Sequence, residues 1–222
     1  PVLAFKEVDT CTGAHQNISL WRDGKNALWD EKASKLSLEG ERFAAGMLET
    51  MQDFHLLFRP FVNSFRRFDP GAFSPVHVSW GEDNHFSSLR VVHGAHPEKL
   101  TRLEHRVAGT DTNIYLSLAA IILGGLHGMD NELSLPESID GKLPDEYDVP
   151  LLSSTLPAAI ENFRTSSYSK KCFGEAFVEH YCLLKDGEWE MFETWAKDND
   201  TDSEHNSRNV TQWEYDHYFD WL

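Results

Sequence analysis

Cysteine is scarce in this chain, and two kinds of segment are missing from it. Cys11, Cys172 and Cys182 form an odd set without the paired spacing of a metal site, which favours reduced thiols in a cytoplasmic protein. No run of about 18 apolar residues occurs, and no signal-peptide pattern opens the sequence. We therefore expect neither a membrane span nor export.

Basic residues are also in the minority. The 222 residues include 20 Lys and Arg against 36 Asp and Glu, which gives a formal net charge of -16. This balance disfavours a nucleic-acid or anionic-membrane surface, although it permits local cationic pockets. The length and the hydrophobic content of 41% suit a globular chain with a substantial core. Because the chain starts at Pro1 and soon enters a motif, we expect it to be the C-terminal part of something longer.

Charge is concentrated in one short stretch, Arg-Leu-Glu-His-Arg at residues 102–106. In a strand, residues two apart share a face at a separation of about 7 Å, so Arg102, Glu104 and Arg106 should point the same way. At that separation Glu104 can hold a metal ion while each arginine holds an anion. An ordinary solvated face with cross-strand ion pairs is the alternative for these residues taken alone.

A second polar face lies near the start of the chain. Alternation places His15, Asn17, Ser19 and Trp21 on one side of a strand, with apolar side chains on the other. A lone histidine is more often structural, but His15 belongs to a polar face, and imidazole is a good ligand for a divalent ion. The Asp-Gly pair at residues 23–24 then predicts a turn.

The remaining pattern mixes strands and helices. Apolar periodicities and capping residues predict strands at 75–80, 87–93 and 102–106, and helices that start at Ser37, Asn113, Thr155 and about Gly174. The first of these helices should run to Pro60. The helix after Asn113 is so uniformly apolar that we expect it to be buried on most sides.

Three further segments carry their own expectations. Residues 63–71 are polar and turn-rich, with adjacent Arg66 and Arg67, and their plain interpretation is a surface loop. Residues 197–209 form a polar run that we expect to be exposed or mobile. The aromatic tail, 210–222, is expected to dock on this chain or on a neighbour.

Taken in order, these segments resemble the C-terminal catalytic portion of the glutamine synthetase superfamily. The order is a Gly-x-His-x-Asn-x-Ser strand, a long helix, an Asn-Ser-aromatic-basic-Arg segment, a Trp strand, an Arg-x-Glu-x-Arg strand and an Asn-x-Tyr-Leu helix. Residues 70–75 and 107–113 look more like the γ-glutamyl-polyamine synthetase branch, which includes glutamate–putrescine ligases, than the ammonia-using enzymes. The resemblance covers nearly the whole chain.

The resemblance implies an α+β fold in which antiparallel strands carry the site on one face and helices cover the other. Residues 1–222 would form the C-terminal part of a single catalytic domain, without the N-terminal β-grasp domain. The implied activity is ATP-dependent ligation of the γ-carboxyl group of glutamate to a small amine through a γ-glutamyl phosphate. It would belong to a cytoplasmic homo-oligomer of stacked rings, and the isolated 222 residues should be inactive. Glutamine synthetase using ammonia and a noncatalytic structural relative are the alternatives.

The resemblance also implies roles for individual residues. The implied metal ligands, for Mg²⁺ or Mn²⁺, are His15 and Glu104. The implied contacts to ATP are Asn17, Ser19, Arg102 and His85. Glutamate and the transferring phosphoryl group would be surrounded by Arg67, Arg90 and Arg106, and Phe73 would lie beside the amine.

Two of these positions depart from the family pattern. Phe73 stands where ammonia-using members have a glutamate that holds ammonium, and an apolar side chain suits the carbon chain of a larger amine, although a simple filling role fits it as well. His85 stands where an arginine usually lies near the phosphates. We therefore expect an organic amine as the acceptor, for example a diamine whose distal charge meets Glu82 or Asp83.

Overall fold

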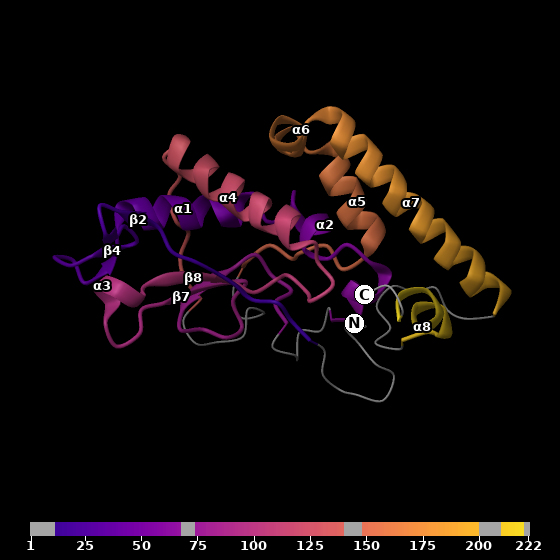
Figure 1. The fold of residues 1–222 in the computed structure, drawn as a ribbon, viewed down its shortest axis with the longest axis horizontal. Coiled ribbons are helices and arrows are strands. Elements are labelled where there is room, and N and C mark those ends of the chain that lie inside the picture. The colour runs from indigo at the N-terminus through magenta and orange to yellow at the C-terminus, as the bar shows by residue number, and fades with distance from the viewer. Residues whose placement is uncertain (1–11, 68–73, 140–147, 200–209, 220–222) are drawn as a thin grey trace.

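The structure is a computed structural model that describes residues 12–67, 74–139, 148–199 and 210–219. It is an α+β arrangement in which helices lie along one side of a small sheet (Figure 1). The strands are β1 Gln16–Ile18, β2 Trp21–Arg22, β3 Lys25–Asn26, β4 Trp29–Asp30, β5 Lys35–Leu36, β6 Trp80–Glu82, β7 Leu89–Val92 and β8 Arg102–His105. The predicted fold class is confirmed.

The main sheet has the order β1-β8-β7-β6, and it is mixed rather than antiparallel. The pairs β1–β8 and β7–β8 are antiparallel, whereas β6 and β7 are parallel. The expectation of a purely antiparallel sheet was therefore wrong at this edge. A connection as short as residues 83–88 ordinarily makes a hairpin. Here the connection contains Asp83 with a positive φ of 48° and a hydrogen bond from Ser87 Oγ to the carbonyl oxygen of Asn84, and β7 runs parallel to β6.

The register divides the sheet into two faces. Side chains on paired residues share a face, because successive residues alternate across a strand. The charged face carries Asn17, Glu104, Arg90 and Gly81, which are paired in that order across the four strands. The helix face carries Gln16, His105, Leu89 and Trp80, which are paired in the same way. The sheet thus brings residues 16–18 onto the same surfaces as residues between 80 and 105.

The helices are α1 Leu38–Glu49, α2 His55–Phe58, η1 Val62–Arg67 (a 3-10 helix), α3 Pro97–Leu100, α4 Ile114–Asp130, α5 Leu156–Thr165, α6 Ser167–Phe173, α7 Glu175–Asp198 and α8 Gln212–Tyr218. The predicted caps are confirmed. The side chains of Ser37, Asn113 and Thr155 each accept hydrogen bonds from the first turn that follows. Within the described residues, no helix is long and apolar enough to cross a membrane.

The helix expected from Ser37 to Pro60 is broken in two. α1 ends at Glu49, and α2 begins only at His55. The hydroxyl of Thr50 donates to the carbonyl oxygen of Gly46 at 2.9 Å, a local bond that competes with continuation of the helix. The apolar side chains on both sides of the break still enter one core.

Glycines set the packing of α1 against α4. A Cβ at Gly46 would overlap the backbone of Gly124 and Gly128, and a Cβ at Gly128 would overlap the carbonyl oxygen of Arg42. The two helices therefore lie in backbone contact, a spacing that only glycine permits.

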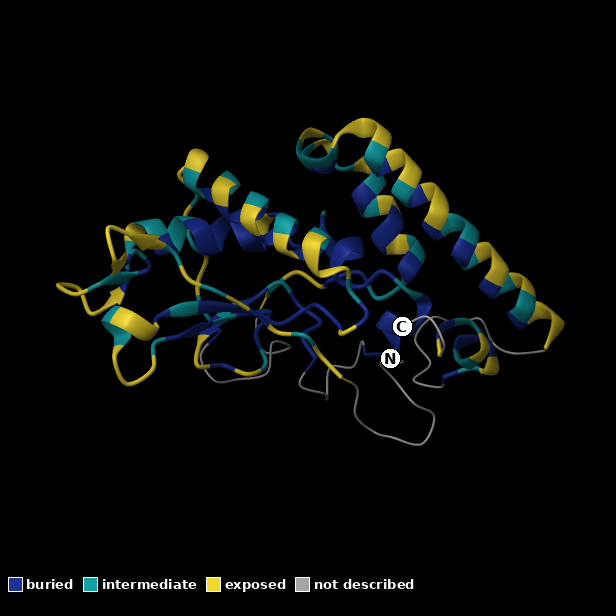
Figure 2. Ribbon diagram, in the orientation of Figure 1, coloured by how far each residue is buried: buried dark blue, intermediate teal, exposed yellow. Residues whose placement is uncertain are grey.

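The outer side of α4 remains exposed, so the expectation that this helix is buried on most sides was wrong. Its exposed apolar residues include Ile114, Tyr115, Leu118, Ile122 and Leu126, and Tyr115 keeps 82% of its surface accessible. Because the contact with α1 is made by glycines, the large apolar side chains are left on the opposite side. Figure 2 shows exposed residues of α4 in yellow along the helix.

A second group of helices, α5 to α7, packs beside α2, and the chain end folds onto it. The expected docking of the tail on this chain is observed in α8, where Trp213 is buried and contacts Phe192 of α7 edge-on, with ring centroids 5.2 Å apart. Figure 1 shows α8 beside the far end of α7. Most of the polar run at 197–209 lies outside the described residues.

Candidate functional site

Glu104 is the centre of a charged cluster on the charged face. Its Oε1 lies 3.2 Å from Nδ1 of His15, and its Oε2 accepts hydrogen bonds from Arg90 at 3.1 Å and from Arg106 at 3.2 Å. Strand β8 presents Glu104, β7 presents Arg90, and His15 directly precedes β1. The pairing of β1, β8 and β7 thus brings the predicted residues together, and the expected convergence of His15 and Glu104 is observed.

The protonation states in this cluster suit a metal ion or an anion. Burial raises the pKa of Glu104, but Arg106, Arg90 and His15 together outweigh burial and hold the pKa below its usual value. Burial lowers the pKa of His15, and Arg106 lowers it further, against the opposing effect of Glu104. At neutral pH the pair is therefore a carboxylate and a neutral imidazole.

These forms are the ones in which carboxylate and imidazole bind a divalent cation, so His15 and Glu104 fit the implied Mg²⁺ or Mn²⁺. Among the described residues there is no group of three or more His, Cys, Asp or Glu side chains that could hold a metal ion. The two residues would thus supply part of a ligand set. The arginines beside them suit phosphate oxygens, which guanidinium groups bind through paired hydrogen bonds.

Arg67 reaches the same region from η1. Its Nη1 donates to the carbonyl oxygen of Ala108 at 3.3 Å, and a Cβ placed on Gly13 would come within 2.7 Å of its Nη2. The same hypothetical Cβ would lie 3.4 Å from Nε2 of His15. Gly13 therefore leaves the space in which Arg67 and His15 approach each other.

The segment that carries Arg67 is buried, so its plain interpretation as a surface loop was wrong. All residues from 62 to 67 are buried. Ser64 explains part of this, because its hydroxyl accepts from the backbone N–H of Phe61 at 3.0 Å and donates to Asp111 at 2.5 Å. Polar side chains that find buried partners can leave the surface at little cost.

Asp111 is a residue of the site that the sequence did not single out. It is buried under η1, and burial raises the pKa of its carboxyl group to about 6, against the opposing effects of Ser64, Arg67 and Arg59. Only its place in the polar run before the helix at Asn113 marked it in the sequence, and the partner Ser64 is 47 residues away.

The expected nucleotide contacts lie on the neighbouring part of the charged face. Nε of Arg102 donates to Oδ1 of Asn17 at 3.0 Å, so these two residues are brought together. Ser19 lies just past β1, where its hydroxyl accepts from the indole N–H of Trp21 at 2.9 Å. All three are at least partly exposed and accessible to a ligand.

The structure does not bring His85 to the cluster, and it does not describe Phe73. His85 is exposed on the connection between β6 and β7, and among the described residues no hydrogen bond ties it to the cluster. Phe73 lies outside the described residues. Asp83, by contrast, forms an ion pair with Nη2 of Arg90 at 3.0 Å.

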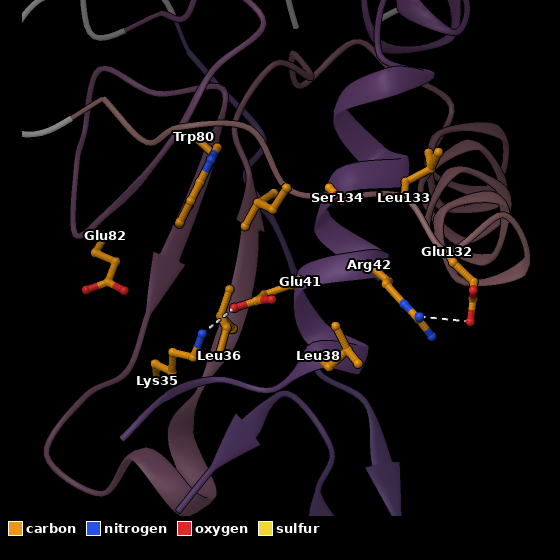
Figure 3. Close-up of a pocket in the computed structure, with 11 residues that line it drawn as sticks. Lys35, Leu36, Leu38, Glu41, Arg42, Trp80, Glu82, Glu132, Leu133 and Ser134 are labelled. Carbon is orange, nitrogen blue, oxygen red and sulfur yellow. Dashed lines mark hydrogen bonds and ion pairs between the residues drawn. The ribbon is translucent and has the colours of Figure 1, made fainter. Parts of the chain in front are cut away.

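The hollow in Figure 3 lies away from the cluster. It has a volume of about 390 Å³, and Trp80 and Glu82 line it from the helix face. Lys35 pairs with Glu41 at 3.0 Å across one side of it. Of the two acidic residues considered for a distal amine, Asp83 is therefore the one that lies at the cluster.

The chain is similar to known proteins over most of its length. The sequence matches the family model described as glutamine synthetase, catalytic domain, over residues 5–204. A solved structure entitled GmaS/ADP complex has a TM-score of 0.75 at 21% identity, covering 99% of this chain and 49% of that chain. At that identity the likeness concerns the fold.

Curated relatives include enzymes named for different acceptors. The γ-glutamylethanolamide synthetase GlnA4 of Streptomyces coelicolor is 37% identical over 188 residues, which cover 83% of this chain and 39% of that protein. The γ-glutamylputrescine synthetase PuuA of Escherichia coli is 37% identical over 186 residues, covering 82% and 38%. A glutamine synthetase of Methanosarcina mazei is 31% identical over 189 residues, covering 82% and 42%.

The chain thus spans less than half the length of these relatives. Its sheet brings the carboxylate of Glu104, the imidazole of His15 and the guanidinium groups of Arg90 and Arg106 together. These are residues of the motifs that the sequence had singled out. Since the catalytic-domain match extends over far more than half of the sequence, the chain belongs to the glutamine synthetase family of carbon–nitrogen ligases.

Proposed function

We propose that the protein containing this chain uses ATP to join the γ-carboxyl group of glutamate to an organic amine. The observation that carries the proposal is the cluster in which Glu104 contacts His15, Arg90 and Arg106. The two substrates of the first step, glutamate and ATP, are both anionic. Fixed guanidinium groups and a metal-binding pair reduce the repulsion between them.

The reaction has two steps. An oxygen of the γ-carboxylate attacks the γ-phosphorus of ATP, the bond to ADP breaks, and a γ-glutamyl phosphate forms. The amine nitrogen then attacks the acyl carbon, phosphate leaves, and the nitrogen loses a proton. Arg67, Arg90 and Arg106 stabilise the negative charge on the substrate carboxylate and the transferring phosphoryl group in both steps.

The other residues of the charged face are proposed to bind the metal ion and the nucleotide. His15 and Glu104 are the proposed ligands of Mg²⁺ or Mn²⁺, which supplies further positive charge to the nucleotide phosphates. Asn17 and Ser19 lie along the nucleotide, with Arg102 beside its base or phosphates. His85 is assigned to the phosphate end, from the exposed connection between β6 and β7.

The proposed acceptor is an amine larger than ammonia. Phe73 replaces the glutamate with which ammonia-using relatives hold ammonium, and buried methylene groups stabilise a bound alkyl amine by about 0.8 kcal/mol each. The relatives named for ethanolamine and putrescine products are each 37% identical to this chain, and the glutamine synthetase of M. mazei is 31% identical. Glutamine synthetase activity with ammonia is the second candidate.

Residues 1–222 are proposed to be the C-terminal part of one catalytic domain, in a cytoplasmic homo-oligomer of stacked rings. The support is the share of its relatives that the chain spans, 39% of GlnA4 and 38% of PuuA. His15 and Glu104 are only two metal ligands, and the described residues contain no group of three. The remaining ligands would therefore come from other parts of the full-length protein, which agrees with this proposal. The 222 residues alone should therefore have no ligase activity.

The decisive experiment uses the full-length protein with ATP, glutamate and Mg²⁺, while only the amine is varied. Phosphate release and the mass of the product are measured with ammonia, ethanolamine and putrescine. We expect the highest kcat/KM with one of the organic amines. A higher kcat/KM for ammonia would favour glutamine synthetase, and failure to bind ATP would favour a noncatalytic structural relative.

A further inference from the structure

The helix η1, which carries Arg67, is held by the C-terminal helix α8. Glu214 of α8 is fully buried, and its Oε1 accepts a hydrogen bond from Nδ2 of Asn63 at 2.8 Å. Its Oε2 lies 3.0 Å from Nη2 of Arg66, in a pair whose side chains are 4% and 0% exposed. One carboxylate thus binds both the beginning and the end of η1.

Glu214 is itself fixed before it meets η1. It is the third residue of α8, where its Oε2 accepts from the backbone N–H of Thr211 at 2.8 Å and from the hydroxyl of Thr211 at 2.9 Å. The hydroxyl of Thr211 in turn accepts from the backbone N–H of Glu214, which completes a capping box. The carboxylate therefore has a defined position and little rotamer freedom to lose.

A second contact from α8 acts at the start of η1. The hydroxyl of Tyr218 accepts from the backbone N–H of Val62 at 3.3 Å, and it lies 2.5 Å from Oε1 of Glu188 on α7. Nζ of Lys185 forms an ion pair with Oε2 of Glu188 at 2.9 Å. Two separate side chains of α8 thus bind η1, and both are buried.

The two adjacent arginines of η1 are used differently. Arg66 points to α8 and pairs with Glu214, whereas Arg67 points to the carbonyl oxygen of Ala108 and to the space left by Gly13. Because they are neighbours on one turn, the position of the first limits the position of the second.

We propose that Glu214 is a positioning residue of the site: it fixes η1 through Arg66 and Asn63, and so holds Arg67 where glutamate binds. The role given to glutamate rests on the proposed function. Loss of the carboxylate charge removes the buried ion pair with Arg66 and weakens the bond to Asn63, so α8 holds η1 less firmly. Arg67 moves with it, and Asn17 and Arg102 on the sheet do not.

The test is Glu214→Gln in the full-length protein, with Asp216→Asn as the control, because Asp216 is an exposed carboxylate on the same helix. Loss of a charged hydrogen-bond partner predicts that KM for glutamate rises by about tenfold, while Kd for ATP changes by less than about twofold. Asp216→Asn should match the wild type. A variant that merely lowers the folded fraction would reduce kcat and leave both constants unchanged.

Hydrogen exchange gives a readout that does not depend on ligase activity. In Glu214→Gln the amides of residues 62–67 should exchange faster, whereas those of β8 should not. If the wild type has no ligase activity, the proposed function fails, and the exchange data still decide whether α8 holds η1. Unchanged exchange at 62–67, or an equal change in the glutamate and ATP constants, overturns the proposal.

Tyr218→Phe provides a second variant in case Glu214→Gln does not fold. It removes only the hydroxyl that contacts Val62 and Glu188, and it keeps the ring in the core. The same pattern is expected with a smaller effect, a rise in KM for glutamate of about threefold. No change in that constant or in the exchange of residues 62–67 would count against α8 as the support of η1.

Discussion

Glu104 Oε1 and His15 Nδ1 lie 3.2 Å apart although 89 residues separate them in the chain. The contact exists because β1 pairs with β8 in the register Asn17↔Glu104, which places the residue just before β1 beside the strand. Arg106, which directly follows β8, contacts both residues of this pair.

Glu104→Gln tests the centre of the cluster. The amide keeps the size of the side chain but loses the charge that pairs with Arg90 and binds a cation. We expect kcat/KM of the full-length protein to fall by about 100-fold or more, with weaker Mn²⁺ binding measured by titration. Glu82→Gln is the control, because Glu82 lies on β6, the edge strand beyond β7, and on the helix face. Equal losses in the two variants would contradict the assignment of the faces.

Asp111→Asn should change how stability depends on pH. The folded-state pKa of Asp111 is about 6, above the usual 3.8, because the buried carboxyl group is more stable when protonated. Its favourable contribution is therefore present below pH 3.8 and is lost as pH rises through about 6. In the wild type this should lower the free energy of unfolding by about 3 kcal/mol over that range, and Asp111→Asn should lack this loss. Denaturant titrations at several pH values, with Asp216→Asn as control, would measure this loss of stability. Identical pH profiles for the wild type and Asp111→Asn would refute the raised pKa of the buried carboxyl group.

Phe73→Glu tests the acceptor. A carboxylate at this position should hold ammonium and repel the apolar part of a larger amine, so the ratio of kcat/KM for ammonia to that for the preferred organic amine should rise by about tenfold. Phe73→Leu serves as control, because it stays apolar and should keep the wild-type preference. A Glu variant with an unchanged ratio would mean that Phe73 only fills space.

A pair of Gly→Ala variants tests the contact between α1 and α4. At Gly128 the new methyl group would overlap backbone atoms of Arg42 and Gly46, so we expect the free energy of unfolding to fall by about 3 kcal/mol or more. At Gly187, within α7, no atom of the described residues outside the helix's own nearby backbone and the two neighbouring residues lies within 4 Å of the new methyl group. There the better helix propensity of alanine should raise stability by about 1 kcal/mol. Thermal unfolding of both variants would reveal the opposite signs, and a harmless Gly128→Ala would contradict the close approach.

The sequence predicted those features that depend on neighbouring residues. The caps at Ser37, Asn113 and Thr155 and the alternation of residues 102–106 follow from local chemistry, and the structure contains them. The charged face could be predicted for the same reason, since alternation alone places Glu104 with its arginines.

Other features depend on partners that are distant in the chain. The buried residues 62–67 have partners in Glu214 and Asp111, and the parallel pairing of β6 with β7 across a short connection is one that no local pattern indicates. The exposure of the outer side of α4 follows from glycines that pack against α1, which periodicity cannot distinguish from an ordinary apolar helix.

The pairing of β1 with β8 also has a kinetic consequence. Helices α5, α6 and α7 follow one another and contact one another, so they can form by local contacts, whereas β1 must wait for a strand that lies far along the chain. Closing such a long loop costs conformational entropy before any stabilising contact forms. Pairing between distant strands therefore slows folding. During synthesis β1 emerges first and stays without its partner until β8 appears. The pair of His15 and Glu104 therefore forms only once β1 has paired with β8, and a chain that binds a metal ion there has already made this pairing.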